Sequence, residues 1–392
     1  MKRRTIAGLL AFVLSVAPAV PLIAADGVIK LGIISSVTGS LADVGASTMN
    51  SAEMAKDEIN ADNGLRIDGK TYTLELVKID SKSSRLTATT NVLPLISDEQ
   101  VLAIVGPQSS DRAIAVGGIA NAYKTPMISP WSTAPQTTLN RPFVFRMAAS
   151  MDFQATAITK FTAKEWKATK AAVLYDEISP FPNAMAKMFK QAFEKANGSV
   201  SVVAFESFRT GDTDFSKQLQ TIINSDADFL YTPQYSQEVP LIVHQARKMG
   251  WKKPITGANS WAGKYLVEKC GNECKGLYFA GNFAPVGTTG KAKVFTENYQ
   301  KKYKMQPDEV AALTYDAVHL IAKALNNTNG LTGNIAEDRI KLRDQIATTK
   351  QFEGVTGTTG YFGTGDPPKC IVLIKIDDDS LLTNYDKICP EN

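Results

Sequence analysis

The chain alternates short runs of β-branched and apolar residues with longer segments of helical periodicity, and this alternation restricts its fold more than any other feature. The pattern is typical of parallel βαβ units and predicts an α/β fold with doubly wound sheets. Because 392 residues exceed what one hydrophobic core usually serves, we expect two lobes with a cleft between them. The strand-like runs are residues 28–36, 72–80, 101–106, 126–129, 171–176, 201–208, 229–233, 254–258 and 277–283.

The helix expected after the first run indicates where a ligand would bind. Ser47 is placed to cap its first turn, and apolar residues recur at helical spacing as far as Ile59. Asn63-Gly64 predicts its end. A helix that follows a strand directs free amide groups toward the carboxyl edge of the sheet, which is where ligands bind in open α/β sheets.

Residues 1–25 are predicted to be a cleaved export signal. Basic residues at positions 2–4 precede a short apolar run, and the mature chain is expected to begin near Asp26. The alternative is a membrane anchor, but the apolar run is shorter than the ~20 residues that span a bilayer and is followed by Pro18. No cysteine that could carry a lipid occurs before Cys270. These features predict a periplasmic protein.

Charge gives no indication of a nucleic-acid partner. Without the three basic residues of the signal, the 43 Lys and Arg residues become 40 against 39 Asp and Glu, so the net charge falls from +4 to about +1. The sequence has no stripe of basic residues interleaved with aromatic ones. We therefore expect no nucleic-acid binding.

The four cysteines are an even number in a chain that we expect to be exported, where disulfides form. Cys270 and Cys274 bracket a turn-like segment, and Cys370 and Cys389 bracket the C-terminal strand and tail, which favours two local disulfides. The alternative is a zinc site with four thiolates, but the spacing contains no CxxC pair.

No catalytic or nucleotide-binding pattern is evident. The chain lacks GxGxxG after a strand and GxSxG, and residues 257–264 depart from the phosphate-loop pattern. The two histidines, His244 and His319, fall in apolar helical patterns far from strand ends. We expect no enzymatic activity, no cofactor and no metal.

Polar residues gather where two strand-like runs end. Residues 106–111 open a helix with hydroxyl groups and free amides, an arrangement that favours a carboxylate. The alternative is that Ser109 or Ser110 only caps the helix. Residues 128–133 supply further hydroxyls beside Trp131, whose indole could equally belong to a lobe core.

Six segments of the chain follow one another in a recognisable order. They are VIKLGIISSVTGSLADVG from Val28, AKDEINADNG from Ala55, AIVGPQSS from Ala103, TPMISPWSTAPQTT from Thr125, FVFRMAASMDFQ from Phe143 and DFLYTPQY from Asp228. In order and spacing they resemble the leucine/isoleucine/valine-binding family of periplasmic proteins. The resemblance covers nearly the whole mature chain.

The resemblance implies the type I periplasmic binding protein fold, with two Rossmann-like lobes joined by three crossings. We place the crossings near Met147, Asn282 and Gly360. The expected division is residues 26–146 plus 282–359 for lobe one and residues 147–281 plus 360–392 for lobe two.

The resemblance also implies ligand-binding residues on lobe one. In the family, a serine after Gly-Pro and a threonine after Ser-Pro hold the ligand carboxylate. The matching residues here are Ser110 and Thr133, joined by backbone groups of Trp131 and Ser132.

On lobe two the family contributes aromatic residues and an acid that pairs with the ligand's ammonium group. Tyr235 matches one tyrosine of the family, and Phe181 stands in place of another. At the acidic position this chain has Asn259, which is its main departure from the family.

Asn259 alone favours a ligand without an ammonium group, because an amide compensates a buried cation poorly. Trp131, Phe181, Tyr235 and Trp261 would then surround a flat or bulky apolar body. The alternative remains that another acid approaches the ligand from a loop, and the candidates for it are Asp43, Glu177 and Glu238.

Together these features predict the substrate-binding component of an ABC importer that acts by cleft closure. Its ligands would be amino acids or related small organic carboxylates, aromatic or branched ones among them. Its partners would be this ligand and an ABC permease in the inner membrane, and we expect a monomer. The alternative is a ligand-sensing protein of the same fold in signalling or amide-responsive regulation.

Overall fold

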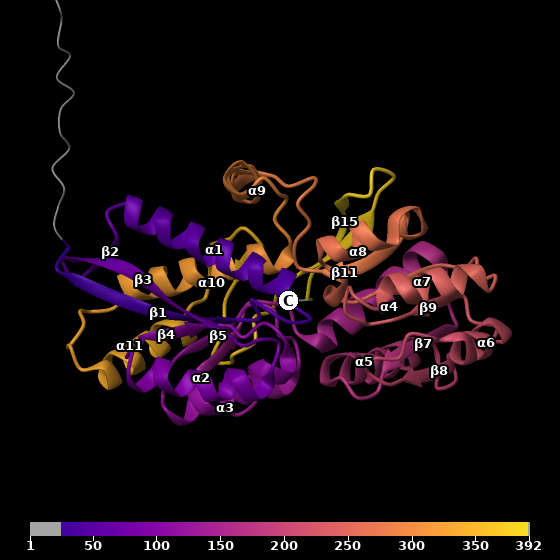
Figure 1. Ribbon diagram of the computed structural model, residues 1–392, viewed down its shortest axis with the longest axis horizontal. Helices are drawn as coiled ribbons and strands as arrows, with labels where there is room; N and C mark the ends of the chain where they lie inside the picture. Colours follow the sequence, from indigo (N-terminus) through magenta and orange to yellow (C-terminus); the bar gives the residue numbers. More distant parts are fainter. Residues whose placement is uncertain (1–24, 391–392) are drawn as a thin grey trace, which may run out of the picture.

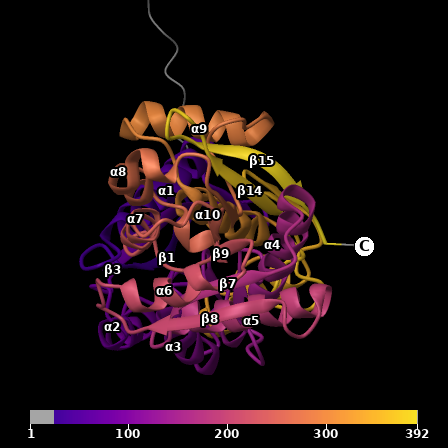
Figure 2. The same cartoon turned by 90° about the vertical axis from the view of Figure 1, so that its right-hand side faces the viewer.

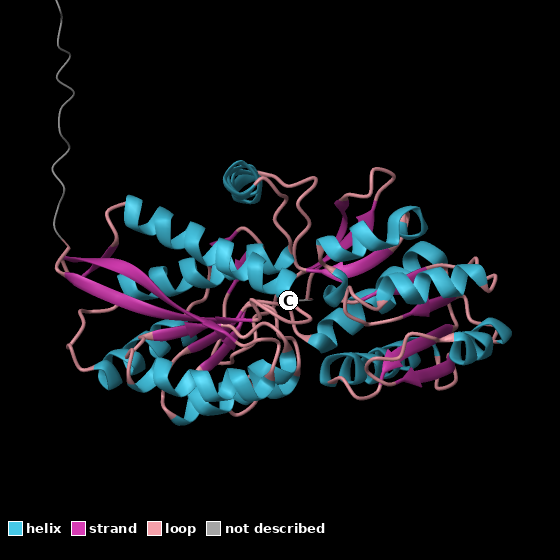
Figure 3. Ribbon diagram, in the orientation of Figure 1, coloured by secondary structure: helices cyan, strands magenta, loops and turns pink. Residues whose placement is uncertain are grey.

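The computed structural model describes residues 25–390, which form two α/β lobes lying side by side (Figure 1). Residues 1–24 of the expected export signal lie outside the described residues. Helices flank a sheet on both sides in each lobe (Figure 3). The predicted fold class, α/β with two doubly wound lobes, is confirmed.

Lobe one is built on a six-stranded sheet with the order β2-β3-β1-β4-β5-β6. Only the β2–β3 pair is antiparallel. Helices α1, α10 and α11 pack on one face, and α2 and α3 pack on the other. The strands are β1 (Gly27–Ser35), β2 (Leu65–Ile67), β3 (Lys70–Asp80), β4 (Ala103–Val105), β5 (Met127–Ser129) and β6 (Val144–Arg146), and the helices are α1 (Ala42–Ala61), α2 (Arg85–Ser97), α3 (Ser110–Ala122), α10 (Glu309–Asn326) and α11 (Ile335–Ala347).

Lobe two is built on a seven-stranded sheet with the order β15-β14-β11-β10-β9-β7-β8. The β11–β14 and β14–β15 pairs are antiparallel, and the other pairs are parallel. Helices α6, α7 and α8 cover one face, and α4 and α5 cover the other. The strands are β7 (Ala171–Asp176), β8 (Val202–Phe208), β9 (Phe229–Tyr231), β10 (Ile255–Gly257), β11 (Tyr278–Gly281), β14 (Ile371–Ile376) and β15 (Leu382–Ile388), and the helices are α4 (Met151–Trp166), α5 (Pro180–Asn197), α6 (Ser216–Asn224), α7 (Val239–Lys248) and α8 (Lys264–Cys270).

The chain passes between the two sheets through three segments. One links β6 to α4, one follows β11 and leads through α9 (Gly290–Tyr303) to α10, and one links β13 (Gly357–Thr359) to β14. Strand β13 pairs with β12 (Phe352–Gly354) in a small separate sheet. Seen from the lobe-two end, α9 lies across the top of the molecule (Figure 2).

All nine strand-like runs of the sequence form strands, with ends that differ by at most two residues. The predicted cap of the first helix is wrong. Helix α1 begins at Ala42, so Ser47 lies inside it and donates to Asp308 Oδ2 at 2.5 Å. The predicted end is correct, because α1 stops at Ala61 and Asn63 and Gly64 both have positive φ.

Both predicted disulfides are confirmed. Cys270 pairs with Cys274 beside α8, and Cys370 pairs with Cys389 across the β14–β15 hairpin. Because all four thiols are bonded in pairs, the alternative of a four-thiolate zinc site is wrong. Within residues 25–390, no helix is long and apolar enough to cross a membrane.

Candidate functional site

A small pocket lies between the lobes, where strands of both sheets end. Its cavity measures about 10 Å³, roughly the space of one water molecule. The lining residues follow β4, β5, β7, β9 and β10 in the chain, so they come from the carboxyl edges of both sheets. They are Gln108, Ser109, Ser110, Trp131, Phe181, Tyr235, Asn259 and Ser260.

Lobe one contributes hydroxyl groups that are hydrogen-bonded in a chain. Ser132 Oγ donates to Ser110 Oγ at 3.1 Å and lies 2.7 Å from Thr137 Oγ1. Ser110 is the first residue of α3, so its backbone amide belongs to the helix end that attracts anions. The preceding turn needs Gly106, since a Cβ there would lie 2.1 Å from the carbonyl oxygen of Ile34.

The capping interpretation of these serines is not supported. Ser109 is the N-cap residue of α3 but makes no side-chain cap hydrogen bond. Its hydroxyl donates to Asp111 Oδ1 at 2.7 Å instead. Neither serine hydroxyl therefore satisfies the first turn of the helix.

Several buried polar atoms around the pocket have no hydrogen-bond partner among the described residues. They include both amide atoms of Gln108, Thr133 Oγ1 and Asn259 Oδ1. Each of these residues is at most 3% exposed. Such atoms are costly to leave unpaired, and a polar ligand would supply their partners.

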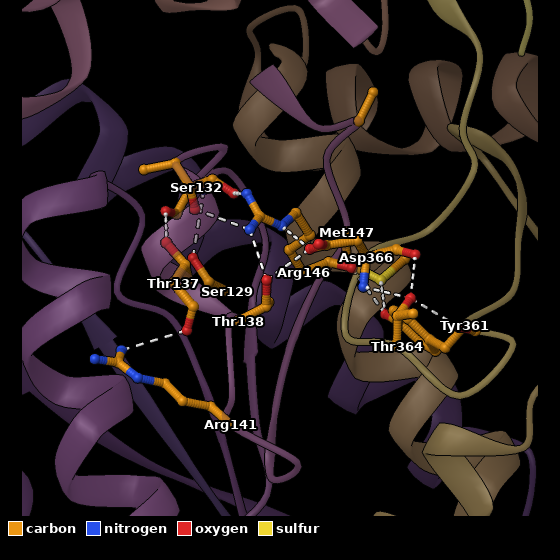
Figure 4. Close-up of polar contacts among 12 residues, drawn as sticks. Ser129, Ser132, Thr137, Thr138, Arg141, Arg146, Met147, Tyr361, Thr364 and Asp366 are labelled. Carbon is orange, nitrogen blue, oxygen red and sulfur yellow. Dashed lines mark hydrogen bonds and ion pairs between the residues drawn. The ribbon is translucent and has the colours of Figure 1, made fainter. Parts of the chain in front are cut away.

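A fully buried arginine holds the loop that carries Ser132 (Figure 4). Arg146 donates to the carbonyl oxygens of Ser132 and Ala134, to Thr138 Oγ1 and to Asp366 Oδ1. Burial lowers the pKa of Arg146, and the Asp366 carboxylate opposes that shift. Arg146 thus ties the loop that carries Ser132 to the segment between β13 and β14.

Aromatic rings dominate the lobe-two side. Phe181, in the first turn of α5, lies 5.7 Å from Tyr235 between ring centroids. Tyr235 lies 6.2 Å from Trp131 of lobe one, so three rings meet across the cleft. Trp131 both lines the pocket and packs in the lobe-one core, so neither of its two interpretations excludes the other.

Behind Asn259 lies a buried acid that the sequence did not reveal. Glu309, the first residue of α10, accepts from Trp131 Nε1 at 3.2 Å and from Asn259 Nδ2 at 3.3 Å. The backbone N–H and the side-chain amide of Asn282 also donate to it. Burial raises the pKa of Glu309 to about 7, and these four donors oppose the rise.

A family model described as periplasmic binding protein matches residues 28–380. The chain belongs to the periplasmic binding protein family. It is 25% identical over 250 residues to the Leu/Ile/Val-binding protein of Escherichia coli, in a match that covers 64% of this chain and 66%, just under two thirds, of that relative.

Solved structures share the architecture of this periplasmic binding protein. A branched-chain amino acid transporter substrate-binding protein of Streptococcus pneumoniae, in complex with isoleucine, is 32% identical with a TM-score of 0.82, covering 93% of this chain and 100% of that chain. A solute-binding protein of an ABC transporter from R. palustris, in complex with benzoate, is 20% identical with a TM-score of 0.80, covering 93% and 97%. The second likeness shows the fold alone.

Five of the seven predicted site residues of this periplasmic binding protein line the pocket: Ser110, Trp131, Phe181, Tyr235 and Asn259. The other two lie just behind it. Ser132 contacts Ser110 through its hydroxyl, and Thr133 is buried with its hydroxyl unpaired. The site-residue prediction omitted Gln108, Ser109 and Ser260, although Gln108 and Ser109 stand in the predicted helix-opening segment.

The residues proposed to replace the missing acid do not line the pocket. This is true of Asp43, Glu177 and Glu238. Trp261 is also displaced from its expected place, because it is fully buried in the lobe-two core and donates to the carbonyl oxygen of Thr232. The signal that could have revealed Glu309 is an acid at a position of α10 whose neighbours are almost all buried and apolar.

Proposed function

We propose that this protein binds a small organic carboxylate between its lobes and delivers it, chemically unchanged, to an ABC permease in the inner membrane. The observation that carries the proposal is that buried, unpaired polar atoms and three aromatic rings gather where the two lobes meet. One side of this arrangement suits a polar head, and the other suits an apolar body. We propose amino acids and related carboxylates with branched or aromatic bodies as the ligand class.

The head of the ligand would bind to lobe one. Ser110 stands at the start of α3, and Thr133 Oγ1 and the Gln108 amide have donors to offer. Hydroxyl and amide donors beside a helix N-terminus stabilise a carboxylate. The arrangement supports Ser110, Ser132 and Thr133 as the groups that orient this head.

The body of the ligand would lie against the rings of Trp131, Phe181 and Tyr235. The ligands of the two solved structures, isoleucine and benzoate, each join a carboxylate to an apolar body. Aromatic rings stabilise both shapes because burial of apolar area against them is favourable for any apolar body.

Binding would require the lobes to separate and close again. A cavity of about 10 Å³ is far below the roughly 300 Å³ of an ordinary small-molecule site. The contacts across the cleft would break on opening, and one of them joins Gln237 Nε2 to the carbonyl oxygen of Ser40 at 3.2 Å. Closure around a ligand would be favoured by the contacts that exist only in the closed state.

Thermal unfolding with a ligand panel tests the proposal. We expect at least one of leucine, isoleucine, valine, phenylalanine and benzoate to stabilise the protein, by about 2.7 kcal/mol at 100 times its dissociation constant. Leucinamide, which lacks the carboxylate, serves as the control and should have little effect. The stabilising compound should also lower the radius of gyration in small-angle scattering. No stabilisation by any carboxylate would contradict the proposal, and an unchanged radius would contradict closure.

A further inference from the structure

We infer that Asn259 and Glu309 act together as the acceptor for an ammonium group on the ligand. The amide oxygen of Asn259 accepts the hydrogen bond, and Glu309 orients that amide and supplies the negative charge behind it. This inference rests on the proposed function and narrows its ligand class to free α-amino acids. It is the opposite of what Asn259 alone suggests, which is a ligand without ammonium.

The orientation of the Asn259 amide is the first observation. Its Nδ2 donates to Glu309 Oε1 at 3.3 Å, so its Oδ1 must point the other way. Asn259 lines the pocket, is 2% exposed, and its Oδ1 has no donor among residues 25–390. A buried acceptor without a donor beside the pocket calls for a ligand N–H or O–H group.

The amide cannot reverse without cost. A reversed amide would place Oδ1 against the carboxylate of Glu309, and two acceptors would then face each other. The main chain is held as well, since the N–H of Asn259 donates to Gln154 Oε1 at 3.4 Å and Ser260 Oγ donates to the carbonyl oxygen of Gln234 at 2.6 Å. Glu309 therefore decides which end of the amide the ligand meets.

The surroundings of Glu309 are the second observation. Its hydrogen-bond donors are the neutral groups of Trp131, Asn259 and Asn282, whereas the buried Lys369 is influenced by its charge without a hydrogen bond to it. Gly281 allows this close packing, because a Cβ there would lie 2.6 Å from Glu309 Oε2. A buried carboxylate that is hydrogen-bonded only to neutral groups is costly, and a cation beyond Asn259 would offset part of that cost.

The pocket brings the two expected subsites together. Ser110 and Asn259 line the same small cavity from opposite lobes. An α-amino acid carries its carboxylate and its ammonium on one carbon, so it could meet the Ser110 side with one group and the Asn259 side with the other. A carboxylate without ammonium would leave Asn259 Oδ1 unpaired in the closed state.

The inference has a pH signature. Burial raises the pKa of Glu309 to about 7, and a nearby ammonium would favour its ionised form. Binding of an amino acid should then release protons below pH 7, so its affinity should rise from about pH 6 to about pH 8 and level off. The matching deaminated acid should show no such rise.

Other titratable groups lie around Glu309. Asp308 precedes it on α10 and is bonded to Ser47, with a pKa raised to about 6 by burial, and Asp43 of α1 contributes to that rise. Lys369, in the segment before β14, has its pKa lowered to about 8 by burial and is influenced by Glu309 and Asp316. Only the part of the pH dependence that disappears in a Glu309 variant belongs to this pair.

Calorimetry with ligand pairs that differ only in the ammonium group tests the inference. Suitable pairs are leucine with 4-methylpentanoate, valine with 3-methylbutanoate and phenylalanine with 3-phenylpropanoate. For each pair that binds, we expect the amino acid to bind about tenfold tighter or more than its deaminated partner. Glu309→Gln should reduce this preference about tenfold and flatten the pH profile. Glu297→Gln, the same change at an exposed position of α9, should keep both.

Asn259→Ala gives a second route if Glu309→Gln does not fold. It removes the acceptor, leaves Glu309 its donors from Trp131 and Asn282, and should reduce the same preference. Equal or tighter binding of the deaminated members by the unmodified protein would overturn the inference while the proposed carboxylate binding stands. An unchanged preference in both variants would also overturn it. No binding by either member of any pair would overturn the proposed function together with the inference.

Discussion

The two sides of the cleft are built on different physical principles. The lobe-one side consists of short hydroxyl side chains joined by hydrogen bonds and supported by the buried Arg146. The lobe-two side consists of the rings of Phe181 and Tyr235 with Asn259 and Ser260, and the Asn259 amide is bonded to Glu309 across the cleft. The first side is organised within its own lobe, whereas the second takes its final form only where the lobes meet.

This difference suggests a division of labour. A preorganised polar surface loses little entropy when it receives a charged head, so lobe one is suited to first contact. Aromatic rings adapt to the size of an apolar body, so lobe two is suited to selection during closure. Both disulfides are also in lobe two, where they stiffen that lobe.

Removal of Arg146 should have the largest effect, because Arg146 supports the preorganised lobe-one side of the cleft. Arg146→Met leaves two carbonyl oxygens and Thr138 without their donor, so we expect a loss of about 4 kcal/mol in the free energy of unfolding. Urea unfolding measures this loss. Lys293→Met, on the exposed face of α9, is the control and should change the free energy little. Equal stability of the two variants would show that Arg146 does not support lobe one.

The disulfide across the β14–β15 hairpin should come next. The double change Cys370→Ser with Cys389→Ser removes a link between residues 19 apart and should cost about 3 kcal/mol. The same change at Cys270 and Cys274, only four residues apart, should cost about 2 kcal/mol because the closed loop is shorter. Thermal unfolding compares the two. The reverse order would mean that loop length does not govern the stiffness of lobe two.

Loss of a single hydroxyl should weaken binding rather than folding. Ser110→Ala or Thr133→Ala removes one hydrogen bond to a charged head, for an expected loss of about 1.5 to 3 kcal/mol, or roughly tenfold to a hundredfold in affinity. Calorimetry with the best carboxylate from the thermal screen measures it. Wild-type affinity in both variants would remove these residues from the site.

A conservative change on the aromatic side should have the smallest effect. Phe181→Leu keeps an apolar side chain of similar volume, so we expect a loss of about 1 kcal/mol or less for a branched ligand. An aromatic ligand should lose more, because ring contacts add stabilisation beyond buried area. The ratio of the two dissociation constants is the measurement. A uniform loss for both ligands would mean that lobe two does not select the body.

The sequence predicted the layered fold well because strand and helix periodicity are local signals. Residues 171–176, for example, form a strand that is buried over its whole length, and the sequence predicted both of its ends. The three-residue strand β2 is too short to show a period, and the start of α1 moved because the backbone turns before Asp43 rather than at Ser47.

The site was harder to predict because it depends on distant contacts. Ser110 and Thr133 came from a family resemblance, since their local pattern fits an ordinary helix start equally well. Glu309 meets Trp131 across 178 positions of sequence, and no local pattern records such a contact. The place of Trp261 could not be predicted for the same reason. Only the fold shows that Gly257 leaves room for its indole inside lobe two.

The interleaved path of the chain also has a consequence for biosynthesis. Helix α10 completes the lobe whose first strand is β1, and β14 and β15 complete the other, so neither lobe has its full core until the ribosome has made most of the protein. Stalled or truncated products that end before Glu309 would expose the apolar face that α10 normally covers. Nascent chains of this protein should therefore depend on chaperones until translation is almost finished.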